Sequence, residues 1–383
     1  MNTDRAHYAK GKCAFHLTSS QEETLQFLKD LFFPYTNRVY IVGGFVRDSM
    51  LNITSNNDID IEVYDIQPDV FEQLMAQIGA IGVGQSFYVH KYQNIDISLP
   101  RTETKTAYGH RGFDVALCND EKTAAQRRDF TMNALMVDLY TMILYDFYSG
   151  LVHLKQKIIC IIDKKRFVED SLRVLRAMRF AAQFGFKIDA KSKLLMREMS
   201  LNDLSQERVV QELEKMFKTK YLHFALYYLF SLNIARQIFS IDIDLKTFIG
   251  LYKFYKMRQK YFNVEVYPYY FLYILNNYTD IDIHKLVFPK KMLRYIESQN
   301  KINFNISLEE LHIIALTMPI KKWLGCLDDE IIIIAKKYHI YDDILVTNVS
   351  ALEVMNDGFK KDAIKKEITR RKLKFIRDKI GSK

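Results

Sequence analysis

The sequence has few of the features that mark secreted or membrane proteins. Its 383 residues include four cysteines, which are scattered and form no C-x-x-C pair, so no disulfide framework is indicated and a reducing cytoplasm fits best. No apolar run approaches the roughly 18 residues of a membrane span. The first twenty residues also lack the apolar core of a secretory signal. We therefore expect a cytoplasmic protein that is neither secreted nor embedded in a membrane.

Acidic residues are outnumbered by basic ones. The chain has 46 Asp and Glu against 55 Lys and Arg, which gives a formal net charge of +9 and an isoelectric point near 9.0. Such a positive field suits a polyanionic partner, such as RNA, DNA or an acidic membrane surface. The length allows two or three small domains, and no internal repeat or low-complexity segment is evident.

The first part of the chain has the pattern of an α/β domain. The spacing of Ser20 and Glu23 resembles a capping box and predicts a helix over 20–33. A β-rich run then ends in two glycines, a helix start follows, and the segments DIDIEVYDI and NIDISLP predict further strands. We expect an α/β sheet domain over residues 25–155.

The remainder of the chain has a helical pattern. From about residue 165 glycine is scarce, strand alternation almost disappears and apolar residues recur with the helical period, as over 206–217 and 308–318. Residues 251–273 interleave aromatic and basic side chains, either to clamp a single nucleic-acid strand or to pack helices together. We expect an all-helical C-terminal half.

Three aspartates suggest metal-dependent phosphate chemistry. Alternate residues of a strand share a face, so Asp58 and Asp60 would project two carboxylates side by side, and Asp96 would join them if its strand is a neighbour. Clustered carboxylates repel one another unless a cation neutralises them, and Mg²⁺ takes carboxylates together with phosphate oxygens. The pattern predicts a two-metal catalytic site. Taken alone, an Asp-x-Asp pair is a structural or merely exposed feature.

Two glycines precede this strand in a position suited to phosphate binding. Gly43 and Gly44 permit a tight turn at a helix N-terminus, where backbone N–H groups can hold a triphosphate. Arg47, one turn later, can add charge-assisted hydrogen bonds. The alternative is a glycine-rich turn in which Arg47 and Asp48 form a surface pair.

The segment RRDFTMNAL over 127–135 carries two adjacent arginines before a helix-forming run. Arg127 and Arg128 can bind phosphate or ribose oxygens, and Asp129 can cap the helix or bond a ribose hydroxyl. Taken alone, the segment is a capped helix with a basic start.

A second predicted helix, over 169–180, carries a pair of side chains able to read a base. Asp170 and Arg173 are three residues apart and share a face, and Arg176 and Arg179 continue the row. An aspartate accepts from an exocyclic amine and an arginine donates to a ring nitrogen, so this pair suits cytosine and adenine and rejects uracil and guanine. The alternative is an intrahelical salt bridge between Asp170 and Arg173.

Four segments together resemble the class II tRNA nucleotidyltransferase and bacterial poly(A) polymerase family. They are YIVGGFVRD…NDIDIEV, RRDFTMNAL, EDSLRVLRAMRFAAQFGF and ERVVQELEKM, which occur in the family's order over about residues 38–217. The resemblance implies an α/β, polymerase-beta-like nucleotidyltransferase head followed by an all-helical half. It divides the chain into a head over 25–155, a neck with the base-reading helix over 156–235, a body over 236–340 and a basic, tRNA-binding tail over 341–383.

The resemblance also implies residue roles. Asp58 and Asp60 would bind the catalytic Mg²⁺, with Asp96 as a third catalytic carboxylate, and Glu169 would support the base-reading pair. In the last segment, Glu207, Arg208 and Glu212 would brace the neck. The expected nucleotide-binding residues are Gly43, Gly44, Arg47, Arg127, Arg128, Asp129, Asn133, Asp170, Arg173, Arg176 and Arg179. The expected RNA-binding residues are Lys365, Lys366, Arg370, Arg371 and Lys374, for which a solvated helix is the alternative.

Within the family, the resemblance favours an enzyme that adds C, C and A to the 3′ end of tRNA from CTP and ATP. Residues 99–115 resemble the flexible loop of enzymes that add all three nucleotides, and residues 82–92 do not match the poly(A) polymerase signature. Phe147 and His153 replace a proline and an aspartate of the family pattern. None of the nine histidines precedes an aspartate, so an appended phosphohydrolase domain is not expected.

The expected partners are the 3′ end and the acceptor and T arms of tRNA, with no membrane and no obligate protein partner. Three alternatives remain open. The chain is a poly(A) polymerase, a partial CC-adding or A-adding enzyme, or, from a different class, a non-catalytic RNA-binding protein that kept the fold.

Overall fold

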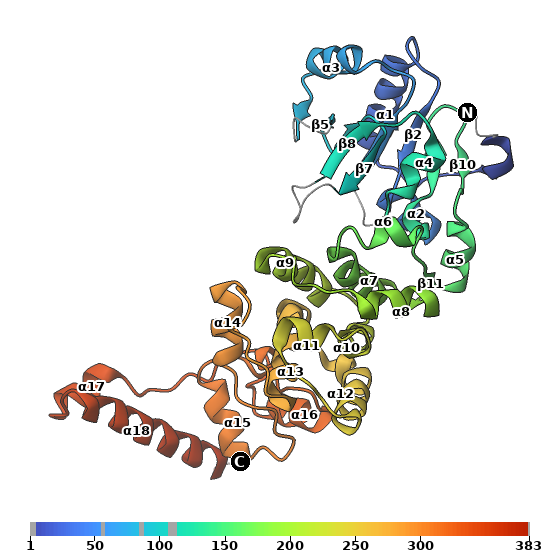
Figure 1. Cartoon of the computed structure of the whole chain (residues 1–383). Coiled ribbons are helices and arrows are strands. Elements are labelled where there is room, and N and C mark those ends of the chain that lie inside the picture. The colour runs from blue at the N-terminus through green and yellow to red at the C-terminus, as the bar shows by residue number, and fades with distance from the viewer. Residues whose placement is uncertain (1–4, 55–57, 84–87, 106–112, 382–383) are drawn as a thin grey trace. The chain divides into compact units, whose positions relative to one another are not determined.

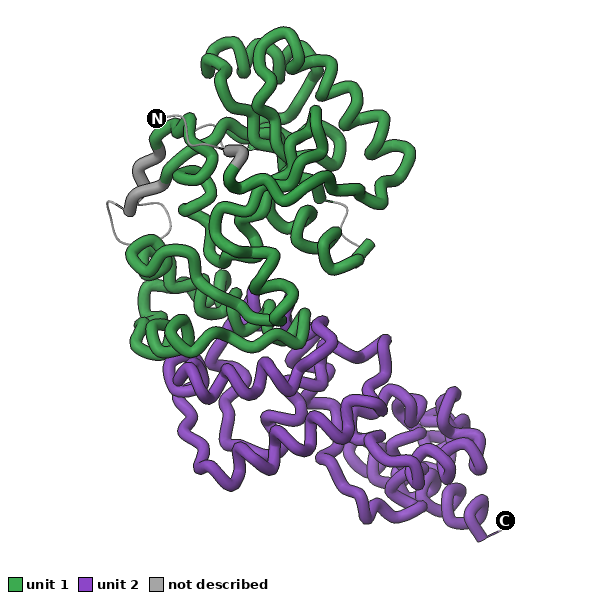
Figure 2. The backbone as a smooth tube through the Cα atoms, turned by 90° about the vertical axis from the view of Figure 1, so that its right-hand side faces the viewer, with its two compact units in different colours: residues 1–209 green, residues 210–383 purple. Residues whose placement is uncertain are grey.

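The chain folds into two compact units, residues 1–209 and residues 210–383, coloured separately in Figure 2. Among the described residues, all strands lie in the first unit, and the second is built from helices (Figure 1). The α/β head and the helical C-terminal half predicted from the sequence are therefore confirmed. The structure, a computed structural model, describes residues 5–54, 58–83, 88–105 and 113–381.

The first unit is built on an eight-stranded sheet in the order β1-β10-β9-β2-β3-β6-β5-β4. Neighbouring strands are antiparallel, except that β3 and β6 run parallel. A parallel pair needs a crossover connection, which here includes the helix α3 (Pro68–Gln77). The strands are β1 (Ala9–Lys12), β2 (Val39–Val42), β3 (Ile59–Val63), β4 (Ile81–Gly82), β5 (Val89–Tyr92), β6 (Ile95–Ser98), β9 (Met136–Asp138) and β10 (Ile143–Tyr145).

The remaining helices of this unit follow the predicted pattern, with one cap displaced. The capping box of the first helix joins Thr18 and Gln21, not the predicted Ser20 and Glu23, because the helix begins at Ser19 and takes both predicted residues into its first turns. These helices are α1 (Ser19–Phe32), α2 (Gly44–Met50), α4 (Glu121–Gln126), α5 (Gly150–Gln156), α6 (Lys164–Phe167), α7 (Leu172–Phe184), α8 (Ala190–Glu198) and α9 (Gln206–Phe217), the last of which contains the boundary between the units.

Two segments of the first unit differ from their predicted structure. The stretch 127–135 forms only a 3-10 turn, Thr131–Asn133, before the chain enters β9, because pairing of β9 with β2 and β10 overrides its local helix-forming pattern. The stretch 99–115, expected as a flexible loop, contributes β7 (Arg101–Lys105) and the start of β8 (Phe113–Leu117), which pair as an antiparallel hairpin (Figure 1). Residues 106–112 of that expected loop lie outside the described residues.

The second unit is helical throughout its described part. Its final helix, α18, contacts α15 and α17. A two-residue parallel pair, β11 (Ile158–Ile159) with β12 (Lys187–Ile188), lies before this unit. The helical half was predicted to begin at about residue 165, so the short strand β12 falls within it. The helices are α10 (Leu222–Ser231), α11 (Ile234–Phe239), α12 (Leu245–Arg258), α13 (Tyr270–Tyr278), α14 (Lys290–Glu297), α15 (Leu308–Ala315), α16 (Asp329–Lys337), α17 (Ala351–Asn356) and α18 (Asp362–Gly381).

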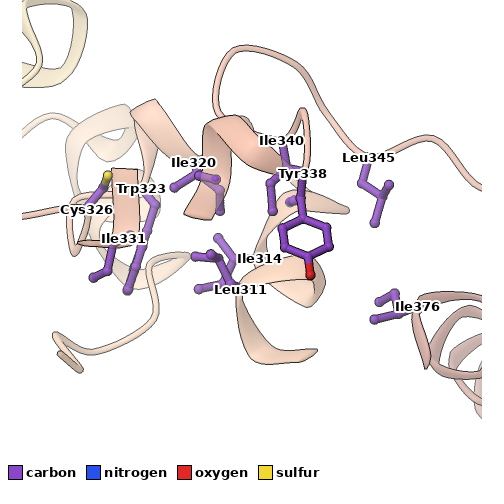
Figure 3. Packing of buried hydrophobic residues seen from close by; sticks show 12 residues of the cluster. Leu311, Ile314, Ile320, Trp323, Cys326, Ile331, Tyr338, Ile340, Leu345 and Ile376 are labelled. Atoms are coloured by element: carbon purple, nitrogen blue, oxygen red, sulfur yellow. The ribbon is translucent and has the colours of Figure 1, made fainter. Parts of the chain in front are cut away.

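An apolar cluster anchors the last helix to this unit. Ile376 of α18 is fully buried and belongs to a cluster with Leu311 and Ile314 of α15 and with Trp323 and Ile331 (Figure 3). Burying an aliphatic side chain of this size contributes about 1.5 to 3 kcal/mol. One face of α18 is therefore tied to the core, and its basic residues occupy the rest of the helix.

The aromatic and basic segment over 251–273 packs helices together. Tyr255 is fully buried, and its hydroxyl donates to the carbonyl oxygen of Phe271 at 2.7 Å. The rings of Phe262 and Tyr270 stack with their centroids 4.1 Å apart. These aromatic side chains serve the core, so the structure favours the packing interpretation over a clamp for a single strand. No helix in the described part of the chain is long and apolar enough to cross a membrane.

Candidate active site

A polar cavity of about 570 Å³ opens in the first unit. Its walls come from the glycine turn between β2 and α2, from β3 and β6, from the segment 127–133 and from the start of α7. Of the residues predicted to form the site, Asp58 and Arg179 are absent from this lining. Its polar lining includes Arg47, Asp60, Glu62, Asp96, Arg101, Arg127, Arg128, Asp129, Asn133, Asp170, Arg173 and Arg176.

The glycine turn admits no side chain. Gly43 has a φ of +76° and caps α2, and a Cβ atom built on it would lie 3.0 Å from Nη1 of Arg128 and 3.3 Å from Oδ2 of Asp60. Glycine is needed here both for this backbone conformation and for the close approach of the turn to an arginine and a carboxylate. The turn therefore borders the cavity with bare backbone, as expected for a phosphate-binding turn.

Two of the predicted carboxylates lie on neighbouring strands. Asp60 of β3 and Asp96 of β6 are directly paired in the parallel register. The strand of Asp96 is therefore a neighbour of the Asp60 strand, as its predicted role required. The pKa of Asp60 is raised to about 6, because burial and the neighbouring Asp96, Glu62 and Asp58 outweigh the lowering effect of Arg128. Arg128 alone does not offset burial and the neighbouring carboxylates at Asp60, and a cation bound beside such a carboxylate would favour its ionised form.

The chemistry of these groups fits a divalent cation. Oδ1 of Asp96 is buried and accepts no hydrogen bond from any described residue, and the nearest cationic partner, Nζ of Lys91, is 3.7 Å away. Carboxylate oxygens of this kind are ligands for hard divalent ions. The described residues nevertheless contain no group of three or more His, Cys, Asp or Glu placed together as a metal cage.

A third carboxylate, that of Glu62 on β3, binds both predicted phosphate-binding arginines. Oε1 of Glu62 accepts from Nη2 of Arg127 at 3.0 Å and from Nη2 of Arg128 at 2.8 Å, and Oε2 accepts from the hydroxyl of Tyr64 at 2.9 Å. Burial acts to raise the pKa of Glu62, but Arg128 and Arg127 lower it to about 2. The sequence analysis missed Glu62, although it follows Asp58 and Asp60 at the same two-residue spacing.

A hydrogen-bonded chain links the segment 127–133 to α7. Asp129 is buried and accepts from Nδ2 of Asn133 at 2.7 Å and from Nε of Arg176 at 2.7 Å, and Asn133 Oδ1 accepts from Nη1 of Arg47 at 2.7 Å. Burial acts to raise the pKa of Asp129, but Arg176, Asn133 and Arg173 together lower it. Asp129 does not cap a helix, since it bonds the backbone N–H of Phe130 at 2.8 Å before the 3-10 turn.

Arg47 is more deeply buried than the sequence suggested. Only 5% of the residue is exposed, and its guanidinium pairs with Asp48 at 2.7 Å. The same group lies over the rings of Phe180 and Phe184 of α7, 5.0 and 4.9 Å from their centroids. The pair with Asp48 considered from the sequence exists, but it is buried and not on the surface.

The predicted base-reading pair occupies the cavity but differs from the predicted helix face. The helix α7 begins only at Leu172, so Asp170 lies before it and accepts from the N–H of Leu172 at 3.2 Å. Asp170 forms an ion pair with Arg208 at 3.3 Å. Arg173 donates to the carbonyl oxygens of Arg166 and Arg127 at 2.7 and 2.8 Å. Among the described contacts, the two side chains do not bridge each other as the alternative interpretation required.

The arginine row predicted along this helix divides. Arg176 faces the cavity and pairs with Asp129, whereas Arg179 lies over the ring of Phe180 at 4.1 Å and donates to Gln183 at 3.3 Å. Arg173 and Arg179 are six residues apart, so their directions differ by about 240° around the helix. The row of arginines therefore turns away from the cavity at Arg179. Glu169 pairs with Arg166 at 3.4 Å.

The basic residues of the tail lie on α18, in the second unit. Arg370 and Arg371 both pair with Glu367, at 2.7 and 2.9 Å. Lys365, Lys366 and Lys374 are exposed on the same helix. The structure places these five residues on one helix and leaves their role in RNA binding as a prediction.

Two family models match separate parts of the chain. The family model described as "Poly A polymerase head domain" matches residues 39–160, and the model described as "Probable RNA and SrmB- binding site of polymerase A" matches residues 185–241. A multifunctional CCA protein of Pasteurella multocida is 40% identical over 192 residues, which are 46% of this chain and 43% of that protein. Residues 39–160 of the chain thus match the poly(A) polymerase head-domain family.

A second curated relative covers a similar share of the chain. A CCA-adding enzyme of Staphylococcus haemolyticus is 35% identical over 214 residues, 54% of this chain and 53% of that protein. The chain thus spans about half the length of the curated relatives it matches.

Solved structures share the fold along most of the chain. A Thermotoga maritima CCA-adding enzyme complexed with tRNA has a TM-score of 0.64 at 20% identity, covering 96% of both chains. A Bacillus stearothermophilus CCA-adding enzyme in complex with CTP has a TM-score of 0.64 at 20% identity, covering 94% of both chains. At this identity the likeness shows the fold, including that of the helical half.

Proposed function

We propose that this chain is a template-independent nucleotidyltransferase that adds C, C and A to the 3′ end of tRNA, using CTP and ATP and releasing pyrophosphate. One observation carries the proposal. A single cavity joins paired carboxylates, paired arginines and an aspartate–arginine pair of the kind that suits cytosine and adenine. The relatives named as a multifunctional CCA protein and a CCA-adding enzyme support it, at 40% and 35% identity.

The family suggests a divalent metal, and we propose that it is Mg²⁺ held by Asp58 and Asp60 with Asp96 beside them. The directly paired positions of Asp60 and Asp96 and the buried, unbonded oxygen of Asp96 support this assignment. When bound there, Mg²⁺ would activate the 3′-hydroxyl of the RNA and stabilise the departing pyrophosphate. The protein's share of the work is to hold Asp60 and Asp96 in register on two neighbouring strands.

The basic side chains of the cavity position the incoming nucleotide. Arg127 and Arg128 present guanidinium groups to the triphosphate, and the bare backbone at Gly43 and Gly44 lets the phosphates approach. Asp129 is held ionised by Arg176 in a position suited to a ribose hydroxyl. These interactions bind any nucleoside triphosphate, so base choice must come from elsewhere in the cavity.

Base choice is assigned to Asp170 and Arg173. Two backbone carbonyls take two of the five guanidinium N–H donors of Arg173, which fixes the group in place and leaves donors for a ring nitrogen. The ion pair with Arg208 holds the carboxylate of Asp170 in place. An amine donor beside a ring acceptor is shared by C and A, and this pair can accept both without a template.

The rest of the chain is assigned to tRNA. We propose the division into a neck over 156–235, a body over 236–340 and a basic tail over 341–383, with the tail binding the RNA backbone through Lys365, Lys366, Arg370, Arg371 and Lys374. The cytoplasm is the compartment proposed for this reaction, in keeping with four cysteines that are all free.

The test is to incubate the purified chain and Mg²⁺ with tRNA that lacks its 3′ CCA, supplying CTP, ATP or both. We expect two nucleotides from CTP alone and three from the mixture. A long run of A from ATP would instead identify a poly(A) polymerase, and addition of only CC or only A would identify a partial enzyme. RNA binding without any addition would mean that the fold is kept for binding alone.

A further inference from the structure

The strand β3 carries a third acidic residue with a task different from that of the two aspartates. Every second residue of an extended strand lies on the same face, so Asp60, Glu62 and Tyr64 share one face. Asp60 and Glu62 both line the cavity. Glu62 is 1% exposed and Tyr64 is fully buried. One strand thus brings the metal-binding carboxylates and this buried pair into a single register.

The contacts of Glu62 are those of an anchor for arginines. Its Oε1 accepts from Nη2 of Arg127 at 3.0 Å and from Nη2 of Arg128 at 2.8 Å, and its Oε2 accepts from the hydroxyl of Tyr64 at 2.9 Å. Arg128 is held at a second point, since its Nη1 donates to the carbonyl oxygen of Asn133 at 3.0 Å. Two adjacent cations whose side chains are 20% and 12% exposed would repel each other without a shared anion.

We propose that Glu62, fixed by the hydroxyl of Tyr64, is the positioning residue that sets the orientation of Arg127 and Arg128 toward the nucleotide triphosphate. The inference rests on the proposed function, because it names what orients that site's phosphate-binding groups. Since Glu62 is two residues from Asp60 on the same strand, it also fixes the distance between the metal-binding carboxylates and these arginines. The triphosphate therefore meets both sets of groups in one geometry.

The chain offers a matched control for a purely structural role. Glu121 is 2% exposed, accepts from the hydroxyl of Tyr40 at 2.8 Å and pairs with Arg38 at 2.8 Å, yet it does not line the cavity. It is therefore a buried glutamate with a tyrosine and an arginine, like Glu62, but without a nucleotide to position. Loss of its charge reports what a buried ion pair contributes to folding alone.

The experiment measures binding of CTP and ATP in EDTA, so that no metal takes part, and KM and kcat for addition to tRNA in Mg²⁺. For Glu62→Gln we expect nucleotide affinity to fall and KM to rise by about tenfold to a hundredfold, the size expected for lost charge-assisted hydrogen bonds. Tyr64→Phe keeps the ring and removes only the hydroxyl, so about a threefold to tenfold effect in the same direction is expected. Glu121→Gln should leave both quantities within about twofold of the wild type.

A double-mutant comparison separates positioning from general loosening. In an Arg127→Ala, Arg128→Ala background, Glu62→Gln should weaken nucleotide binding by no more than about twofold, because the groups it positions are gone. Unchanged nucleotide affinity in folded Glu62→Gln and Tyr64→Phe would overturn the inference, as would an equal loss in Glu121→Gln. If Glu62→Gln does not fold, Tyr64→Phe decides. Failure of the wild-type chain to bind or add nucleotides would instead refute the proposed function.

Discussion

Two pairs of adjacent arginines, Arg127 with Arg128 and Arg370 with Arg371, show how the surroundings of a residue type decide what it can do. Arg127 and Arg128 line the cavity and share Glu62, a carboxylate more than sixty positions away that burial shields from water. Arg370 and Arg371 lie on a helix and share Glu367, three and four residues away. In both pairs the arginines hold the pKa of the glutamate down to about 2.

The difference lies in what each pair can position. A buried ion pair between distant segments fixes guanidinium groups relative to a strand and leaves them little freedom. A pair along one helix is formed by local geometry and is screened by salt, and Arg370 keeps 66% of its side chain exposed. We therefore expect geometry-dependent binding of a nucleotide at the first pair and geometry-tolerant binding of RNA phosphates at the second.

The largest effect is expected from the carboxylates. Asp60→Ala should reduce nucleotide addition at least about a thousandfold, because several kcal/mol of transition-state stabilisation are lost with a metal ligand. Binding of tRNA should remain, since we propose that the basic helical half provides it. Parallel assays of addition and tRNA binding test this, with Asp69→Ala on the exposed side of α3 as control. Residual activity within tenfold of the wild type would refute the metal assignment.

The next effect concerns base choice. Arg173→Ala should reduce the preference for C and A over U and G by about one to two orders of magnitude, since a charged hydrogen bond contributes about 1.5 to 3 kcal/mol. Incorporation of each of the four nucleotides on tRNA ending before its CCA provides the measurement. Arg197→Ala, at an exposed position of α8, is the control. Unchanged selectivity would make Arg173 a structural link between backbone carbonyls.

A smaller loss of nucleotide affinity is expected when a side chain is added at the glycine turn. Gly43→Ala should cost about 1 to 3 kcal/mol of stability from backbone strain, and it should also raise KM for nucleotides about tenfold by displacing Arg128 and Asp60. Gly79→Ala is a matched control, because Gly79 has a φ of +69° but no atom within 4 Å of an added Cβ. Thermal unfolding should shift in both variants, and KM only in the first. Equal KM values would show that the turn does not border the nucleotide.

The smallest effect is expected in the tail, as a change of salt dependence. Reversing Lys365, Lys366 and Lys374 to Glu should reduce the slope of log affinity for tRNA against log salt by about 2 to 3, roughly one for each phosphate contact. Addition to saturating tRNA should change little. Reversal of the exposed Lys10 and Lys12 is the control. A slope equal to that of the wild type would mean that α18 is a solvated helix.

Much of this arrangement follows from local sequence patterns, and the errors arise where distant residues intervene. The head, the glycine turn and the strands with Asp60 and Asp96 were predicted, because alternation and glycine act locally. Asp170 was placed on the helix, yet α7 begins two residues later. The run at 127–135 was predicted helical, yet it forms only the 3-10 turn Thr131–Asn133 before the strand β9, which pairs with β2.

Glu62 shows most clearly what a sequence leaves undecided. Its spacing after Asp60 places it on the right face of β3, but its partners Arg127 and Arg128 come from a segment over sixty residues away. The burial of Arg47 beneath two phenylalanines of α7 is another tertiary effect of this kind. Pairings of distant charges need the fold before they can be assigned.

Sequencing RNA 3′ ends after the reaction tests whether one cavity of this chain adds C, C and A to tRNA. The wild-type chain, supplied with all four nucleoside triphosphates and tRNA lacking its 3′ end, should extend the tRNA by CCA and stop. The same reaction with Asp60→Ala should leave the 3′ ends unchanged. Ends that carry no addition with the wild type, or that carry U, G or a long run of A, would contradict the claim.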